Sequence, residues 1–371
     1  SMAIAAKESG LRAIMLPASN AAEAACIEGL DILPVAHLSE AIDHLRGRRR
    51  IEPLRARPYA ELLGEKKILC DFADVRGQKG AKRALEIAAA GGHNVLMIGP
   101  PGSGKTMMAR CLPGILPDMT LEEALEVTRI HSAAGTLAAD AGLMAERPFR
   151  APHHSSSAAA LAGGSGSPGR LPLPGEITLA HRGVLFLDEL PEFHRDTLEV
   201  LRQPLEDGKV TISRVAGQVT YPARFQLIAA MNPCKCGWYG TERCTCTKAA
   251  VQQYLHRLSG PLLDRIDLQV AVQPVEYAAL AARDQASEEP SADIRARVLA
   301  ARERQYARQG ADVCNAAIPP PQLAEHCPLS ADASRMFAAA FQRLGLTARA
   351  HDRVLRVART IADLADSSVI E

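Results

Sequence analysis

One short stretch of the sequence has the residue types and spacing that bind a nucleoside triphosphate. Gly99–Thr106 reads GPPGSGKT and agrees with the pattern G-x-x-x-x-G-K-[ST] at every position. Gly102 and Gly104 would let the backbone bring its N–H groups to phosphates, and a helix starting there would add a favourable dipole. We expect Lys105 to reach the β- and γ-phosphates and Thr106 to place its hydroxyl on Mg²⁺. The predicted nucleotide contacts are Gly99, Pro100, Pro101, Gly102, Ser103, Gly104, Lys105, Thr106 and Met107.

A second candidate group consists of two adjacent acids. Asp188 and Glu189 directly follow the apolar run Val184–Leu187. Ligands of open parallel sheets bind beyond the carboxyl ends of the strands, so both carboxylates would face the phosphates. We expect Asp188 to hold Mg²⁺ through its water shell, and Glu189 to orient and deprotonate the attacking water. Alone, such a pair could equally cap a helix, but beside the glycine-rich loop the hydrolytic interpretation is favoured.

Five further side chains could act on the γ-phosphate. Asn232 ends an apolar run, and its amide could fix the attacking water, although an asparagine there is commonly a turn former. Arg265 could be an arginine finger that acts on a neighbouring subunit's nucleotide, or a surface ion-pair partner. Arg349 is a further candidate, with Arg353 and Arg356 as rivals on the same predicted helix.

Cysteine and histidine residues form two more clusters. Four of the nine cysteines, Cys234, Cys236, Cys244 and Cys246, lie close together in the sequence, and four thiolates could close a structural zinc site. The C-x-C spacing is tighter than usual, so free thiols or oxidation-prone pairs are an equal alternative. The pair His153–His154 is interpreted as hydrogen-bonding structure, with contact to nucleotide or substrate as the alternative.

These candidates need a parallel sheet to position them. Four short apolar segments, Asn94–Ile98, Gly183–Glu189, Phe225–Asn232 and Asp267–Val272, alternate with segments of helical character. Strands that are apolar on both faces are typical of the middle of a parallel sheet covered by helices. The sequence therefore predicts an α/β core over residues 68–274.

The flanking regions have different patterns. Residues 1–47 alternate strand-like and helix-like segments, which predicts part of a further α/β domain. Residues 48–67 form a charged, proline-punctuated linker, interpreted as a solvated tether. Residues 275–371 have helical periodicity and predict an all-helical module. The opening Ser1-Met2 and a first helix without an N-cap suggest a truncated protein.

Composition narrows the function. The chain has 371 residues, is 47% hydrophobic and carries a formal charge of +1, so any contact with nucleic acid must be local. Aromatic residues make up 4%, which disfavours a stacking platform for single strands. No apolar run approaches the roughly 20 residues of a membrane helix, and no secretory leader is present, so we expect a cytoplasmic protein.

The motifs and their order resemble AAA+ ATPases of the helix-2-insert branch, which includes magnesium chelatase subunits, MoxR-like proteins and MCM helicases. The finer likeness, over almost the whole chain, is to the Mg-chelatase-like ComM (YifB) family. It rests on RPFRAPHHSSSAAALAGG, PGEITLAHRGVLFLDELPEF, EVLRQPLEDGKVTISR, AAMNPCKCGWYG and SGPLLDRIDL. The resemblance implies an AAA+ P-loop fold with a three-layer parallel sheet, a helical lid over 275–371, and the end of a Lon-protease-like (S5 domain 2-like) domain over 1–47.

The same resemblance implies an activity: a hexameric, ATP- and Mg²⁺-dependent DNA motor that promotes branch migration in natural transformation and homologous recombination. By motif it assigns Lys105 and Thr106 to Walker A, Asp188 and Glu189 to Walker B, Asn232 to sensor 1, Arg265 to a finger in trans, and Arg349 to sensor 2. A MoxR- or chelatase-like remodeller of proteins, or a metal-insertion chaperone, is the alternative. A slow, nucleotide-gated scaffold fits the complete set of acids and arginines less well.

Two segments could contact DNA. Gly163–Glu176 is a glycine-rich insertion that carries Arg170, and Lys209–Pro222 alternates like a β-hairpin and carries Lys209 and Arg214. In the family both segments project toward the pore of the ring, where a few cations per subunit would suffice to follow phosphates. Ordinary surface loops are the alternative. With no helix-turn-helix or zinc-finger signature, DNA binding would use backbone and shape.

Overall fold

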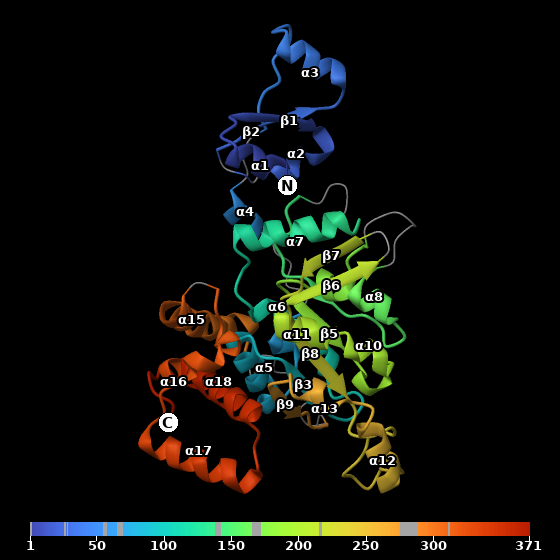
Figure 1. Cartoon of the computed structure of the whole chain (residues 1–371), viewed down its shortest axis with the longest axis vertical. Helices are drawn as coiled ribbons and strands as arrows, with labels where there is room; N and C mark the ends of the chain where they lie inside the picture. The colour runs from blue at the N-terminus through green and yellow to red at the C-terminus, as the bar shows by residue number, and fades with distance from the viewer. Residues whose placement is uncertain are drawn as a thin grey trace. The chain divides into compact units, whose positions relative to one another are not determined.

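A computed structural model describes residues 2–25, 27, 29–54, 58–64, 70–137, 142–164, 172–214, 217–274, 288–310 and 312–371. The chain forms two compact units. Unit 1 comprises Ser1–Lys67 and Asp118–Arg147, and unit 2 comprises Ile68–Pro117 and Pro148–Glu371. Figure 1 shows the elements of both units along the chain. Among the described residues, no helix is both long and apolar enough to cross a membrane.

Unit 1 contains a small parallel sheet. Strand β1 pairs with β2 in parallel, with Ile14 opposite Ile32. Alanines from α1 and α2 pack on this sheet with Ile27 and Leu30. The alternation of strand and helix expected for residues 1–47 is therefore confirmed. The helices and strands of unit 1 are α1 (Met2–Glu8), β1 (Ala13–Pro17), α2 (Ala18–Ala24), β2 (Asp31–Val35), α3 (Leu38–Leu45), α4 (Tyr59–Gly64) and α7 (Leu121–Ala133).

Helices α4 and α7 of unit 1 share a second apolar cluster. The hydroxyl of Tyr59 donates to the carbonyl oxygen of Met119 at 2.9 Å. Thr120 caps α7 by accepting from the backbone N–H of Glu123, whose side chain accepts from the backbone N–H of Thr120 in return. Arg147 lies 3.2 Å from the Glu123 carboxylate. This ion pair links the last residue of the segment Asp118–Arg147 to α7.

Unit 2 is built around a five-stranded sheet with the order β4-β5-β8-β3-β9, and every pair of neighbours is parallel. The strands are β3 (Val95–Ile98), β4 (Phe149–Arg150), β5 (Val184–Leu187), β8 (Gln226–Met231) and β9 (Leu268–Ala271). The four strands expected from the sequence are confirmed. Because β8 lies between β5 and β3, the residues that follow these three strands meet at one edge of the sheet.

Helices cover both faces of the sheet and make three layers. On β5, Val184 and Phe186 pack toward α5, α6 and α15, whereas Leu185 and Leu187 pack toward α8, α10 and α13. Burial on both faces explains why these strands read as continuous apolar runs. The core helices are α5 (Lys79–Gly91), α6 (Lys105–Ile115), α8 (Ala158–Ala162), α9 (Glu176–Leu179), α10 (Arg195–Glu199), α11 (Arg202–Asp207), α12 (Lys248–Leu255) and α13 (Gly260–Leu263).

The C-terminal region is helical, as expected, and two of its helices, α15 and α18, lie beside α5; the helices of this region are orange to red in Figure 1. They are α15 (Ser291–Gln309), α16 (Leu323–His326), α17 (Ala331–Leu344) and α18 (Ala348–Leu364). Buried polar contacts fasten this lid to α5. Arg302 donates to the carbonyl oxygen of Ala89 at 2.7 Å, and Gln305 to that of Ala90 at 3.0 Å. The lid thereby satisfies carbonyl groups that the last turn of α5 leaves without intrahelical partners.

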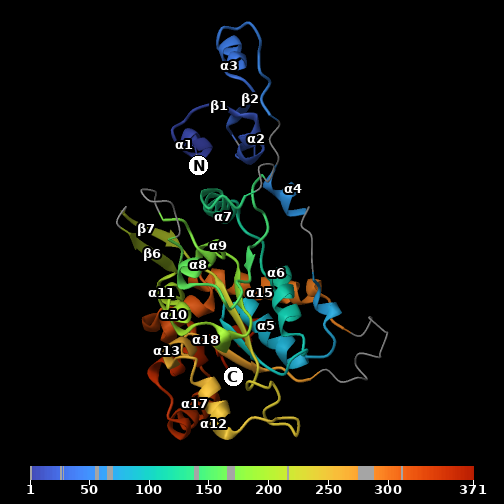
Figure 2. The ribbon, with the colours of Figure 1, turned by 90° about the vertical axis from the view of Figure 1, so that its right-hand side faces the viewer.

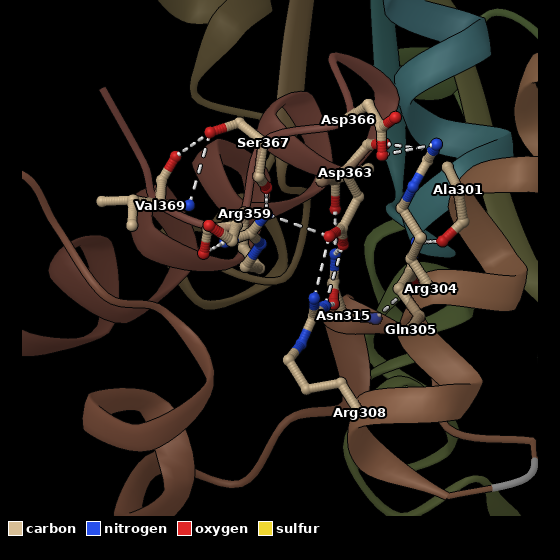
Figure 3. A network of polar contacts seen from close by, with 12 residues as sticks. Ala301, Arg304, Gln305, Arg308, Asn315, Arg359, Asp363, Asp366, Ser367 and Val369 are labelled. Carbon is tan, nitrogen blue, oxygen red and sulfur yellow. Dashed lines mark hydrogen bonds and ion pairs between the residues drawn. The ribbon is translucent and has the colours of Figure 1, made fainter.

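A buried charge network joins three segments of the lid (Figure 3). The carboxylate of Asp363 is 1% exposed and accepts two hydrogen bonds from Arg308 at 2.8 Å and one from Asn315 at 2.7 Å. Arg359, also 1% exposed, lies 3.0 Å from the same carboxylate. Burial lowers the pKa of the Arg359 guanidinium, and the charge of Asp363 acts in the opposite direction. The two arginines therefore depend on Asp363 for a buried counter-charge.

Removing this counter-charge should destabilise the lid. Asp363→Asn leaves buried guanidinium groups without a compensating charge, and we expect it to lower the free energy of unfolding by about 3 kcal/mol. Asp366→Asn is the matched control, because Asp366 is 75% exposed and pairs with Arg304 at the surface. The control should cost less than about 1 kcal/mol. Denaturant titration followed by circular dichroism measures both, and equal losses would contradict the counter-charge role.

Candidate nucleotide site

The glycine-rich loop lies between β3 and α6, as its motif requires. Gly104 adopts a left-handed backbone (φ 86°) directly before α6 begins at Lys105. The Lys105 ammonium donates to the carbonyl oxygens of Gly99 and Pro100, both at 2.8 Å. Burial lowers the pKa of Lys105, and the charges of Asp188 and Glu189 oppose that shift. The lysine charge is therefore held at the loop, facing both acids.

The two residues expected to hold Mg²⁺ touch one another. The Thr106 hydroxyl donates to Asp188 Oδ2 at 2.7 Å, and Asp188 Oδ1 accepts from the backbone N–H of Glu189 at 3.0 Å. Thr106 lies in the first turn of α6, and Asp188 follows β5 directly. Hydroxyl and carboxylate oxygens are the hard ligands that Mg²⁺ prefers, so the donor set fits this ion.

Glu189 has an unusual backbone and a partner that the sequence does not reveal. Its φ of 52° and ψ of 46° are left-handed, which is uncommon for a side chain of this size and typical of functional sites. Oε2 of Glu189 lies 3.3 Å from Nδ1 of His154, within hydrogen-bonding distance. The His154 ring lies 4.1 Å from the His153 ring at a tilt of 34°, and it meets Phe193 edge-on. His154 thus positions the proposed base, a role that no spacing in the sequence indicates.

His153 has the hydrogen-bonding role that the sequence predicts for the histidine pair. Nδ1 of His153 lies 2.8 Å from the Ser155 hydroxyl and also accepts from the Ser155 backbone N–H at 3.3 Å. His153 is therefore part of a local hydrogen-bonded turn.

Asn232 completes the group at the sheet edge. It follows β8, and its Oδ1 lies 3.4 Å from the Lys105 ammonium. The sheet order accounts for this contact, because β8 neighbours both β3 and β5. One edge of the sheet thus gathers a lysine, an asparagine, a threonine and two acids from three separate motifs.

Arg265 and Arg349 gather around a different carboxylate. Arg265 donates to the Pro261 carbonyl oxygen at 2.7 Å and forms a close ion pair with Glu206. The hydrogen bond from Arg265 lowers the pKa of Glu206, and the charge of the exposed Arg349 contributes a smaller effect in the same direction. Arg265 therefore pairs with Glu206, and the charge of Arg349 acts on the same carboxylate.

The rival lid arginines have structural partners. Arg353 donates to the carbonyl oxygens of Leu263 and Ile266 at 3.2 and 3.0 Å, and Arg356 to that of Ile318 at 2.9 Å. These bonds fix α18 to neighbouring turns. They favour Arg349 over its two rivals as the arginine available to a nucleotide.

The expected hairpin is confirmed. Strands β6 (Lys209–Arg214) and β7 (Gly217–Pro222) pair antiparallel over their full length, and they project from the rest of unit 2 (Figure 2). Lys209 is exposed. The Arg214 side chain and the whole of Arg170 lie outside the described residues.

The base of the glycine-rich insertion rests on this hairpin. The Tyr221 hydroxyl donates to the Pro172 carbonyl oxygen at 2.6 Å. Gly163 and Pro174 form an isolated antiparallel bridge, and a Cβ on Gly163 would lie 2.9 Å from Ile212 of β6. The two candidate DNA-contacting segments are therefore in contact where the insertion begins and ends.

Comparison with known proteins agrees with this architecture. The family described as "Magnesium chelatase, subunit ChlI" matches residues 71–280, and "Magnesium chelatase, subunit ChlI C-terminal" matches residues 288–371. YifB of Escherichia coli is 44% identical over 359 residues, which cover 97% of this chain and 69% of the relative. Competence protein ComM of Haemophilus influenzae is 43% identical over 365 residues, or 98% and 70% of the two chains. The chain belongs to the ComM/YifB family.

Membership of the ComM/YifB family makes the sheet and its P-loop a Mg-chelatase-like AAA+ domain. The second match covers the helical lid. Part of the chain is also similar to Lon protease 2 of Bacillus subtilis, at 32% identity over 171 residues, which cover 43% of this chain and 30% of that protein. The AAA+ fold class and the partial likeness to Lon proteases inferred from the sequence are both confirmed.

Proposed function

We propose that this ComM/YifB-family chain is the ATPase subunit of a ring, expected to be a hexamer, that moves along DNA and promotes branch migration. The observation that carries the proposal is the convergence of Lys105, Asn232 and the Thr106–Asp188–Glu189 group at one edge of the sheet. The name of the Haemophilus relative, a competence protein, supports a place in natural transformation and in recombination of the incoming DNA.

Each residue at the edge has a distinct chemical task in ATP hydrolysis. Lys105 binds the phosphate oxygens, and Asn232 orients the attacking water or the γ-phosphate. Thr106 and Asp188 hold Mg²⁺, which supplies neutralising charge to the phosphates. Glu189 accepts the proton of the attacking water, and the His154 contact fixes the direction in which its carboxylate points. Arg265 stabilises the developing charge at a neighbouring subunit's site.

A short path of packed groups connects this chemistry to the hairpin. His154 lies against Glu189, and Ser157 caps the helix α8 that follows it in the chain. Helix α8 ends at Ala162, directly before Gly163, the first residue of the insertion, and Tyr221 holds the base of the insertion to the hairpin. We propose that a change at Glu189 during hydrolysis reaches the DNA-contacting segments through α8, because each step is a direct contact or a single short helix.

DNA contact is proposed for Lys209 and Arg214 on the hairpin and Arg170 on the insertion. With a formal charge of only +1, the chain offers no general attraction for phosphates. Binding should therefore depend on these few cations, repeat around the ring and be independent of base sequence.

The test is ATP hydrolysis stimulated by single-stranded DNA, measured over a range of salt concentrations. Lys209→Ala/Arg214→Ala should raise the DNA concentration for half-maximal stimulation roughly tenfold. The slope of the logarithm of DNA affinity against the logarithm of salt concentration should decrease in magnitude by about 1 for each cation removed. Lys248→Ala/Arg335→Ala is the matched control, since it removes the same charge from exposed positions on α12 and α17.

One result would contradict the DNA motor. If light scattering shows an oligomer, ATP is hydrolysed, and DNA of any structure leaves the rate unchanged, the proposed substrate is wrong. A rate raised instead by an unfolded protein would establish the remodelling alternative. Equal effects of the hairpin variant and its control would show that the hairpin is not the DNA contact.

A further inference from the structure

The loop between β8 and α12 carries four thiols that come together in space. The Sγ atoms of Cys234, Cys236, Cys244 and Cys246 all lie within 4.8 Å of one another. Three of the separations are 3.3 Å (Cys234–Cys236), 3.7 Å (Cys236–Cys244) and 3.9 Å (Cys234–Cys244). Tetrahedral zinc with Zn–S bonds of about 2.3 Å places its sulfurs about 3.8 Å apart. The cluster therefore has the dimensions of a four-thiolate zinc site.

The arrangement distinguishes a shared ion from disulfide pairs. Cys234 is close to both Cys236 and Cys244, and these two are close to each other, so no exclusive pairing stands out. All of the cysteines in the described residues are free. Mutual proximity of four thiols is what one tetrahedral ion requires, whereas two disulfides would need only two close pairs.

The backbone of the loop is shaped to present the sulfurs. A turn closes the first cysteine pair, because the backbone N–H of Gly237 donates to the Cys234 carbonyl oxygen at 2.9 Å. A second turn precedes the other pair, where the N–H of Cys244 donates to the Thr241 carbonyl oxygen at 3.1 Å. Two turns that each deliver a thiol pair suit a closed structural site, which keeps no position open for catalysis.

This loop also touches the phosphate-binding loop. Gly237 has a φ of 86°, and a Cβ placed on it would lie 2.6 Å from Cδ of Pro101. Only glycine fits there, because both the left-handed backbone and the close approach exclude a side chain. Asn232 lies two residues before Cys234, so the cluster is joined to the sensor position as well.

We propose that Cys234, Cys236, Cys244 and Cys246 bind one structural zinc ion, and that this ion holds Gly237 against Pro101 to support the phosphate-binding loop. The metal site goes beyond the proposed function. The support of the loop rests on that function, since it assumes that the loop binds ATP.

The first experiment measures the metal in the purified chain by mass spectrometry after dialysis. About one zinc per chain is expected, and Cys244→Ser/Cys246→Ser should retain less than a tenth of it. Cys314→Ser is the matched control and should keep the full amount, because Cys314 lies in the lid beside Arg302. A wild-type chain with reduced thiols and no zinc would overturn the site, as would full zinc in the double variant.

Cobalt tests the site without any substitution. Stripping the wild-type chain with a chelator under reducing conditions and adding Co²⁺ should produce the intense visible bands of tetrahedral cobalt thiolate at one equivalent. Bands typical of six-coordinate cobalt would overturn the four-thiolate assignment. This measurement decides the question even if the double variant fails to fold.

The support of the phosphate loop is tested by binding of a fluorescent ATP analogue to the zinc-loaded and stripped chain. We expect stripping to weaken binding about tenfold, and re-added zinc to restore it. Equal affinities would show that the ion does not support the loop. If neither form bound the analogue, the proposed ATPase function would fail, while the zinc and cobalt measurements would still decide the metal site.

Discussion

Replacing Arg265 with alanine should lower the rate of ATP hydrolysis by about a thousandfold or more, the size of effect known for arginine fingers. Within the described residues of its own chain, the Arg265 guanidinium bonds to Pro261 and Glu206, whereas Lys105 is bonded to the phosphate loop and Asn232. We therefore expect Arg265 to serve a neighbouring subunit's nucleotide. ATP binding measured with a fluorescent analogue should change little, because the finger acts on the transition state.

A mixing experiment separates action in trans from action within one subunit. Arg265→Ala subunits keep Glu189, and Glu189→Gln subunits keep Arg265, so a mixed ring contains some interfaces with both groups. Activity should reappear on mixing two inactive preparations if the finger acts in trans. No recovery in rings shown to be mixed would place the finger within its own subunit. Arg202→Ala is a suitable control, since Arg202 is a similar surface arginine paired with Glu199.

Glu189→Gln should slow the hydrolysis step by about 10²- to 10⁴-fold while ATP remains bound. Glutamine preserves the shape of the side chain and can still hydrogen-bond to His154, but it cannot accept the proton of water. Single-turnover hydrolysis under saturating ATP measures this step directly. Lys105, Thr106 and Asp188 are untouched, so the variant should trap the bound nucleotide.

The matched control for Glu189 lies on the turn that follows it. Glu192→Gln removes a carboxylate that pairs with Arg257 at 2.9 Å and is 40% exposed, and the rate should change less than about twofold. Equal loss in both variants would assign the effect to the turn rather than to a general base. Full activity of Glu189→Gln would remove Glu189 from the mechanism.

Structure could be predicted well where the residues of a motif are contiguous in the sequence, because the geometry of such a motif is local. Lys105 and Thr106 follow the glycines that shape their loop, and the apolar run before Asp188 already predicts the buried strand that delivers it. The edge of the sheet then follows from parallel topology. The fold class, the lid and the hairpin could be inferred on the same basis.

Contacts between distant segments could not be inferred in this way. His154 meets Glu189 only because α8, which follows it, packs on the face of the sheet where Leu185 and Leu187 of β5 point. Arg353 and Arg356 donate to backbone carbonyl oxygens. Because every residue type has such an oxygen, the sequence does not indicate which residue will accept these bonds. The packing of α7 with α4 in unit 1 likewise depends on tertiary structure rather than on the pattern of either helix.

The hydrogen bonds that fasten the lid to the end of α5 limit how the motor can move. Rotating the lid about the core would strip Ala89 and Ala90 of their partners and break the 2.8 Å contact between His93 and Thr360, all in buried surroundings. Each lost buried bond costs about 1–3 kcal/mol. The sheet and the lid should therefore move as one rigid body. Conformational change during the ATP cycle should then occur at the interfaces between neighbouring subunits. The distance between spectroscopic labels on α5 and α18 should then stay the same throughout the ATP cycle.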